Sequence, residues 1–214
     1  LPALLITALF DVIGLQFDAA LYYEGPWAFA DKDAWLNYAL SLVLVQNVWE
    51  LNLNPGINTP FWSLTYELFY YIFWGVFLFV SGPIRYLAIV LLALTAGPTI
   101  VALFPIWLIG VVVFKLQKNK AVQGFLAMPI MFYIALVLLV FLVITSPAVR
   151  EIDFSIAGVG RDSILGDYFD ALVFALHMLI IANPPEIVKR VLLFNERIIR
   201  WAGSLTFALY LFHR

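Results

Sequence analysis

One segment of the chain gathers a carboxylate, hydroxyls and several large aromatic rings at helical spacing. It spans residues 58–71, with the sequence NTPFWSLTYELFYY. On a helix Ser63, Glu67 and Tyr70 fall on one face, because residues three and four apart are neighbours. Inside a membrane a carboxylate is costly unless it is paired or hydrated, so Glu67 is a candidate for binding a polar group or relaying a proton. The alternative is that Glu67 pairs with a basic side chain of a neighbouring helix and serves packing.

Other ionisable side chains also lie in or beside apolar stretches, at Asp11, Asp167, Asp170, His177 and His213. A neutral imidazole at His213 could accept a proton from an acceptor hydroxyl, or it could be a hydrogen-bonded structural residue. For His177 we favour a structural role, and for Asp11 both roles remain open. The two histidines lie in separate segments and the chain has no cysteine, so we expect no metal site.

The composition indicates that these residues work inside a membrane. The chain has 214 residues, of which 64% are hydrophobic and only 12% are charged. The mean hydropathy is +0.98. A soluble domain is close to half apolar and a quarter charged, so this composition excludes a soluble enzyme and a disordered chain. The net charge of −2, without a basic stripe, argues against nucleic acid as a partner.

The elements that must position the candidates are apolar runs long enough to cross a bilayer as helices. We therefore predict an all-α polytopic membrane bundle of about seven spanning helices, forming a single domain over residues 1–214. Pro105 is expected to separate the third run from a short fourth one, and Asn183-Pro184-Pro185 to stop the sixth. The expected runs are 1–17, 61–80, 84–103, 104–116, 128–145, 164–182 and 198 onward.

A further run, residues 36–48, is too short to span and is predicted to lie at the interface or re-enter. The distribution of lysine and arginine supports this topology, since these residues collect on the cytoplasmic side. With this run outside the count, Arg85 and the basic residues of 115–120 and 189–200 all fall inside. Those basic loops are interpreted as topology signals; the alternative is contact with the phosphates of an acyl-CoA.

Three segments carry a resemblance to a known family. The residues Trp62-Ser63-Leu64, followed by Glu67 and aromatic side chains, resemble the signature of the acyltransferase 3 family of membrane O-acyltransferases, and Tyr66 before the glutamate resembles its exopolysaccharide-production subgroup. Residues 104–114, with Gly110, resemble the family's Phe-x-x-Gly helix. Residues 203–213, GSLTFALYLFH, resemble its late helix that ends in histidine, with Phe207 in place of the usual tyrosine.

The resemblance implies an enzyme that moves an acyl group, acetyl above all, from cytoplasmic acyl-CoA to a hydroxyl of a carbohydrate or exopolysaccharide acceptor. Acetyl-CoA would be a co-substrate, with no bound cofactor. Glu67 and His213 are the catalytic candidates, and Trp62, Ser63, Tyr66 and Tyr70 the candidates for binding substrate. The expected partners are membrane lipid and proteins of envelope or polysaccharide synthesis, and the expected location is a bacterial inner membrane.

The resemblance also implies that residues 1–214 are a piece of a longer protein. In the family a catalytic histidine and an Arg-x-x-Arg pair precede a helix that opens like Leu1-Pro2-Ala3-Leu4-Leu5. We therefore expect those residues upstream of Leu1, about ten helices in the whole protein, and no activity from this stretch alone.

A transporter or flippase without acyl-transfer chemistry is the alternative of a different class. Pro98 and Pro105 would interrupt helices, and carboxylates within the membrane would line a path for a polar solute or a lipid-linked glycan. The sequence has no visible inverted repeat, which argues mildly against this alternative.

Overall fold

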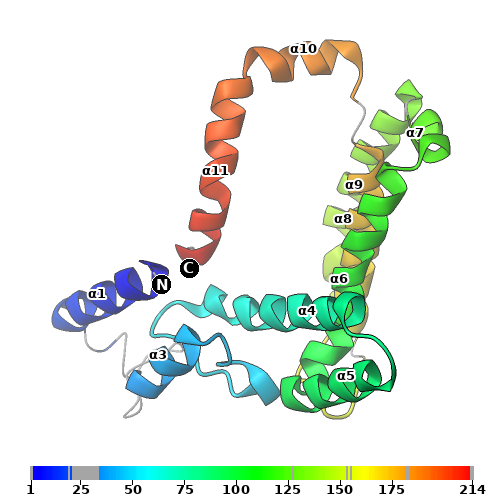
Figure 1. The fold of residues 1–214 in the computed structure, drawn as a ribbon. Coiled ribbons are helices and arrows are strands. Elements are labelled where there is room, and N and C mark those ends of the chain that lie inside the picture. The colour runs from blue at the N-terminus through cyan, green and yellow to red at the C-terminus, as the bar shows by residue number, and fades with distance from the viewer. Residues whose placement is uncertain are drawn as a thin grey trace. The chain divides into compact units, whose positions relative to one another are not determined.

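The computed structural model describes residues 2–18, 20, 34–126, 128–152, 154, 156–181 and 184–212. Within these residues the regular elements are helices (Figure 1). One isolated β-bridge joins Phe154 and Ser163 in this part of the chain. The chain divides into two compact units, Leu1–Ile100 with Trp201–Arg214, and Val101–Arg200, and each is described by itself. The all-α prediction is therefore confirmed for the described residues.

The first unit is built on α4 (Trp62–Phe79), which packs against α5 (Pro83–Ala96). Thr65, Phe69 and Phe73 are buried at intervals of four residues, so they form the packed stripe of α4. The same unit contains α1 (Pro2–Phe17), α3 (Ala34–Leu42) and the end of α11 (Glu196–Phe212). Two single 3-10 turns, Val48–Glu50 and Thr59–Phe61, shape the segment between α3 and α4.

The expected break at Pro105 is wrong, because the helices on either side meet at Gly97-Pro98. Gly97 has a φ of +91°, and Pro98 opens α6 (Pro98–Gln117), which continues through Pro105. Only glycine adopts this φ readily, and a proline is tolerated in a first helical turn. The expected short fourth run is thus one helix of 20 residues.

The second unit is organised around α8 (Pro129–Arg150) and α9 (Ile164–Ile180). These two helices pack side by side (Figure 1). Nδ1 of the buried His177 lies 2.7 Å from the carbonyl oxygen of Ala135, also buried, and fixes the two helices together. The helix α8 continues beyond the expected end at Thr145 through Pro147. Two short helices complete the unit, α7 (Lys120–Leu126) and α10 (Glu186–Phe194).

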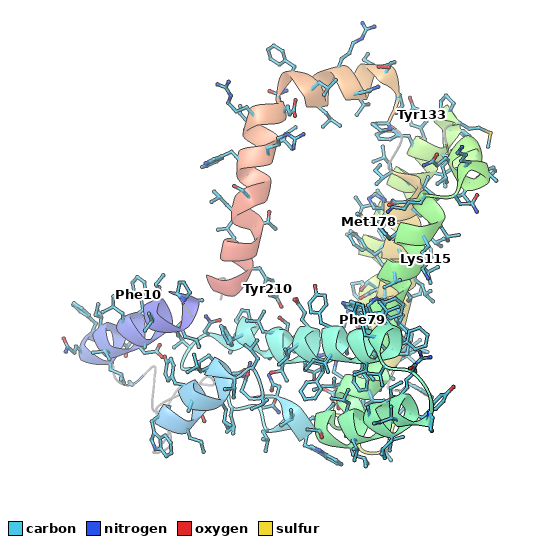
Figure 2. The ribbon with its side chains drawn as sticks, viewed as in Figure 1. Phe10, Phe79, Lys115, Tyr133, Met178 and Tyr210 are labelled. Atoms are coloured by element: carbon cyan, nitrogen blue, oxygen red, sulfur yellow. The ribbon has the colours of Figure 1, made fainter. Side chains whose placement is uncertain are left out.

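Two helices of the described residues, α6 and α8, are long and apolar enough to cross a membrane. Only 17% of the apolar window of α6 and 6% of that of α8 is buried, whereas the core helix of a soluble protein would be mostly buried. Large apolar side chains project outward elsewhere as well, including Phe10 and Phe79 (Figure 2). These are features of a membrane protein.

The expected count of about seven spanning helices is not reached by this measure. The helices α1, α5 and α9 have 16, 14 and 17 residues, which is short for a span of about 20 residues. The helix α4 has 18 residues, and Ser63, Thr65 and Glu67 lower the hydropathy of its first turns. The run 36–48 forms the nine-residue α3 followed by Leu44 at a φ of +57°, so it is too short to cross, in agreement with the prediction.

Candidate functional site

The start of α4 brings most of the predicted substrate-binding residues together. The rings of Trp62 and Tyr66 meet edge to face with centroids 5.0 Å apart, and Tyr66 meets Tyr70 in the same way at 6.3 Å. The three rings are spaced by four residues, so they form one aromatic ladder along α4. Tyr70 is buried, while Trp62 and Tyr66 are half-buried and present ring surface at the start of the helix.

Ser63 stands beside this ladder and is contacted from the other end of the chain. Its hydroxyl donates to the carbonyl oxygen of Pro60 at 3.2 Å, which closes the entry into α4. The hydroxyl of Tyr210, which Figure 2 labels on α11, donates to Ser63 Oγ at 2.9 Å. Two of the three segments that resemble the acyltransferase family thus meet at Ser63. His213, the other catalytic candidate, lies outside the described residues.

Glu67 lies on the exposed side of α4, one turn after Ser63. The packed stripe of the helix, which begins at Thr65, faces another direction. Within the described part of the chain no ion pair involves Glu67. Its carboxylate is therefore exposed. The alternative role, an ion pair with a basic side chain of a neighbouring helix, has no partner among the described residues.

Asp11 has partners that sequence reasoning did not identify. One carboxylate oxygen accepts a 2.6 Å hydrogen bond from the hydroxyl of Tyr38, and the other accepts from the backbone N–H of Ile57 at 3.5 Å. One turn earlier in α1, Thr7 Oγ1 accepts from the side-chain amide of Asn58 at 2.9 Å. Both a structural and a functional role remained open for Asp11 from the sequence; its described partners include a phenol and a backbone amide.

Gly56 makes this arrangement possible. It has a φ of +53°, and a Cβ at this position would lie 1.5 Å from the Asp11 carboxylate. Only a residue without a side chain fits there. A glycine after Pro55 was a visible turn signal, but its partner on α1 could not be read from the sequence.

The segment between α3 and α4 adds a buried polar layer to the same region. The side-chain amide of Gln46 donates to the carbonyl oxygen of Phe61 at 2.9 Å. Buried polar atoms normally have hydrogen-bond partners. Five atoms of this layer have none in the described structure, although their residues are buried: Ser41 Oγ, Gln46 Oε1, Asn47 Nδ2, Asn58 Oδ1 and Thr65 Oγ1. The layer therefore keeps hydrogen-bonding capacity beyond what its own side chains use.

The carboxylates of α9 form ion pairs in the second unit. Arg150 lies 3.2 Å from Asp167 and 2.5 Å from Asp170, and Arg161 lies 2.9 Å from Asp167. Ser146 also donates to Asp170 at 3.0 Å. Two arginines thus balance two aspartates, and the contact of His177 with α8 agrees with the structural role favoured for this histidine from the sequence. Among the described residues no group of three His, Asp or Glu side chains could hold a metal ion.

Gly110, from the remaining segment that resembles the family, lies in an apolar groove between α6 and α9. The groove has a volume of about 440 Å³, and Phe114, Phe174 and Met178 also line it. Gln117 closes one end by donating to the carbonyl oxygen of Met178 at 3.0 Å.

Comparison of the chain with protein-family models, curated proteins and solved structures found no match.

Proposed function

We propose that this chain carries the acceptor side of a membrane O-acyltransferase, which moves an acyl group, acetyl above all, from cytoplasmic acyl-CoA to a carbohydrate hydroxyl. The observation that supports this most is the hydrogen bond between Tyr210 and Ser63. It joins two segments, 147 residues apart, that both resemble the same family.

The chemistry asks for a base beside the acceptor. The acceptor hydroxyl gives its proton to a carboxylate or imidazole, for which Glu67 and His213 are the candidates, as its oxygen attacks the thioester carbonyl carbon. The new C–O bond forms, the C–S bond breaks, and the CoA thiolate leaves and takes up a proton. The hydroxyls of Ser63 and Tyr210 would orient the acceptor oxygen.

A carbohydrate acceptor agrees with the side chains around the start of α4. Trp62 and Tyr66 present aromatic surface on which a sugar ring can stack.

The proposed setting is a multi-pass topology in a bacterial inner membrane, with about seven helices of this chain spanning it. The outward-facing apolar side chains of α6 and α8 support the proposed location in a membrane. The clustering of basic residues at one end of alternate helices supports the proposed orientation of the helices. Shorter helices can span where the bilayer thins locally around them.

The test is transfer of label from acetyl-CoA to a soluble glycan by the native protein in phospholipid vesicles. We expect transfer, with at least about a 100-fold loss in Glu67→Gln, since this is the usual contribution of a general base. The matched control is Glu151→Gln, which removes an exposed carboxylate after the end of α8 and should leave transfer unchanged.

Two results would contradict the proposal. Full activity of Glu67→Gln would remove Glu67 from the mechanism. Uptake of a glycan or other polar solute by the vesicles, without any transfer of label, would show the transporter alternative to be right.

A further inference from the structure

The helix α10 is more amphipathic than the helices α9 and α11 on either side of it. Ile187, Val191 and Phe194 are spaced by four and three residues, so they lie along one face. They are 73%, 59% and 89% exposed. The opposite side carries Glu186, Lys189 and Arg190, together with Leu193. An apolar face this exposed on a helix of nine residues needs an apolar surrounding that the described structure does not supply.

The charges beside this face favour an anionic surface. Between residues 186 and 200 there are four basic side chains and two acidic ones, a net charge of 4 − 2 = +2. Lys189 pairs with Glu186 at 3.5 Å and Arg200 with Glu196 at 2.5 Å, both between exposed side chains. Such pairs are weak and exchange readily. Arg190 and Arg197 are exposed and have no ion pair within the described residues.

The chain on both sides restricts where α10 can lie. It begins directly after Pro184-Pro185 and ends at Asn195, whose side-chain amide bonds back to the carbonyl oxygen of Val191 at 3.0 Å. The helices α9 and α11, both spans in the proposed topology, precede and follow it. Nine residues rise about 14 Å, too little to cross a bilayer. A short amphipathic helix between two spans, rich in basic residues, is suited to the plane of the interface.

We propose that α10 lies in the cytoplasmic surface of the membrane, with Ile187, Val191 and Phe194 at the acyl-chain boundary and Arg190 and Arg197 on the headgroups of anionic phospholipids. This rests on the proposed function only in its membrane topology. The occupant of the exposed face is the lipid itself, because one surface offers both the apolar depth and the negative charge that α10 matches.

The absence of cysteine from the chain makes a direct test possible. Single cysteines replace Ile187, Val191 or Lys189 in the native protein, with Val140, an exposed position of α8, as the reference for a spanning helix. Each carries a nitroxide label and is reconstituted in phosphatidylethanolamine vesicles with or without phosphatidylglycerol. Collisions with oxygen report hydrocarbon, and collisions with a water-soluble nickel chelate report water.

We expect the labels at 187 and 191 to favour oxygen, at shallower depth than 140, and the label at 189 to favour the chelate. Phosphatidylglycerol should increase the depth of the labels at positions 187 and 191 in the bilayer. The double substitution Arg190→Gln with Arg197→Gln should abolish that increase. Lys118→Gln with Lys120→Gln removes the same charge from another basic loop and should preserve it.

Each half of the proposal can fail separately. Suppose that the labels at 187 and 191 collide with the chelate as often as the label at 189, while the label at 140 stays in hydrocarbon. Then α10 lies in water and the inference is overturned, although the membrane topology stands. If 140 also meets the chelate, the proposed multi-pass topology fails. Depths that do not respond to phosphatidylglycerol would overturn the assignment to anionic lipid.

Discussion

Tyr210 donates a hydrogen bond to Ser63 across 2.9 Å, hydroxyl to hydroxyl, although 147 residues separate them in the chain. Ser63 donates its own hydrogen bond to the carbonyl oxygen of Pro60, so the two hydroxyls form a short chain of hydrogen bonds that ends in the turn before α4. The end of α11 is thereby tied to the residue that stands beside the aromatic ladder of α4.

Tyr210→Phe should weaken this tie without changing the packing volume. We expect a loss of about 0.5–1.5 kcal/mol in the free energy of unfolding, the usual net value of one hydrogen bond. The effect should largely disappear in a Ser63→Ala background, which a double-mutant cycle by thermal unfolding in detergent would measure. Tyr133→Phe removes an exposed hydroxyl of α8 and serves as control. Additive losses from the two substitutions would argue against the contact.

Gly56→Ala should be among the most damaging single-methyl changes in the chain. The added Cβ would lie 1.5 Å from the Asp11 carboxylate, at a φ of +53° that alanine adopts with strain. We expect at least about 2 kcal/mol of destabilisation. Gly75→Ala in α4 has no atom within 4 Å of the new Cβ, so it should be neutral or slightly stabilising. Similar melting temperatures for both variants would contradict the packing of Gly56 on Asp11.

Arg150→Gln should loosen the α8–α9 pair. Asp170 would lose both of its bonds to the guanidinium and keep only that of Ser146, whereas Asp167 would keep Arg161. Because Arg150 is 45% exposed, we expect only about 1–2 kcal/mol. Arg161→Gln should cost less, since Asp167 still has Arg150. The rate of proteolysis within the 151–163 connection measures the loosening in both variants, and we expect faster cleavage in Arg150→Gln. Faster cleavage in Arg161→Gln would contradict this prediction.

Tyr168→Phe should destabilise α6 at its internal proline. Pro105 lacks the N–H that would bond the carbonyl oxygen of Val101, and its ring crowds that turn, while Tyr168 donates to the next carbonyl oxygen of the turn, that of Ala102, at 2.6 Å. In a Pro105→Ala background the helix can satisfy this turn by itself, so Tyr168→Phe should then cost about 1 kcal/mol less. Unfolding measurements on the four proteins of this cycle would decide, and an equal cost in both backgrounds would mean that the proline is irrelevant to the bond.

The amino-acid pattern predicts the helices well and their mutual contacts poorly. The apolar runs 1–17 and 164–182 became α1 and α9 with ends shifted by two residues or fewer. The misplaced break at Pro105 has a local cause: two prolines seven residues apart both interrupt the pattern, and only Pro98 follows a glycine with positive φ. Helical periodicity identifies such runs but does not say which proline ends a helix.

Contacts between distant segments escaped prediction for a different reason. The spacing of Trp62, Tyr66 and Tyr70 follows from one helix, so their ladder was foreseeable from residue numbers alone. The partners of Asp11 come from α3 and the following loop, whose path depends on the positive φ of Gly56. No periodicity within α1 contains that information.

The division of the chain into units has a consequence for the order of synthesis. The first unit comprises Leu1–Ile100 and Trp201–Arg214, whereas the second is continuous. During translation the helices α8 and α9 can pack against each other as soon as both have emerged, since they are neighbours in the sequence. The hydroxyl of Ser63 must wait until Tyr210 has left the ribosome, so the half of the molecule that is made first is completed last.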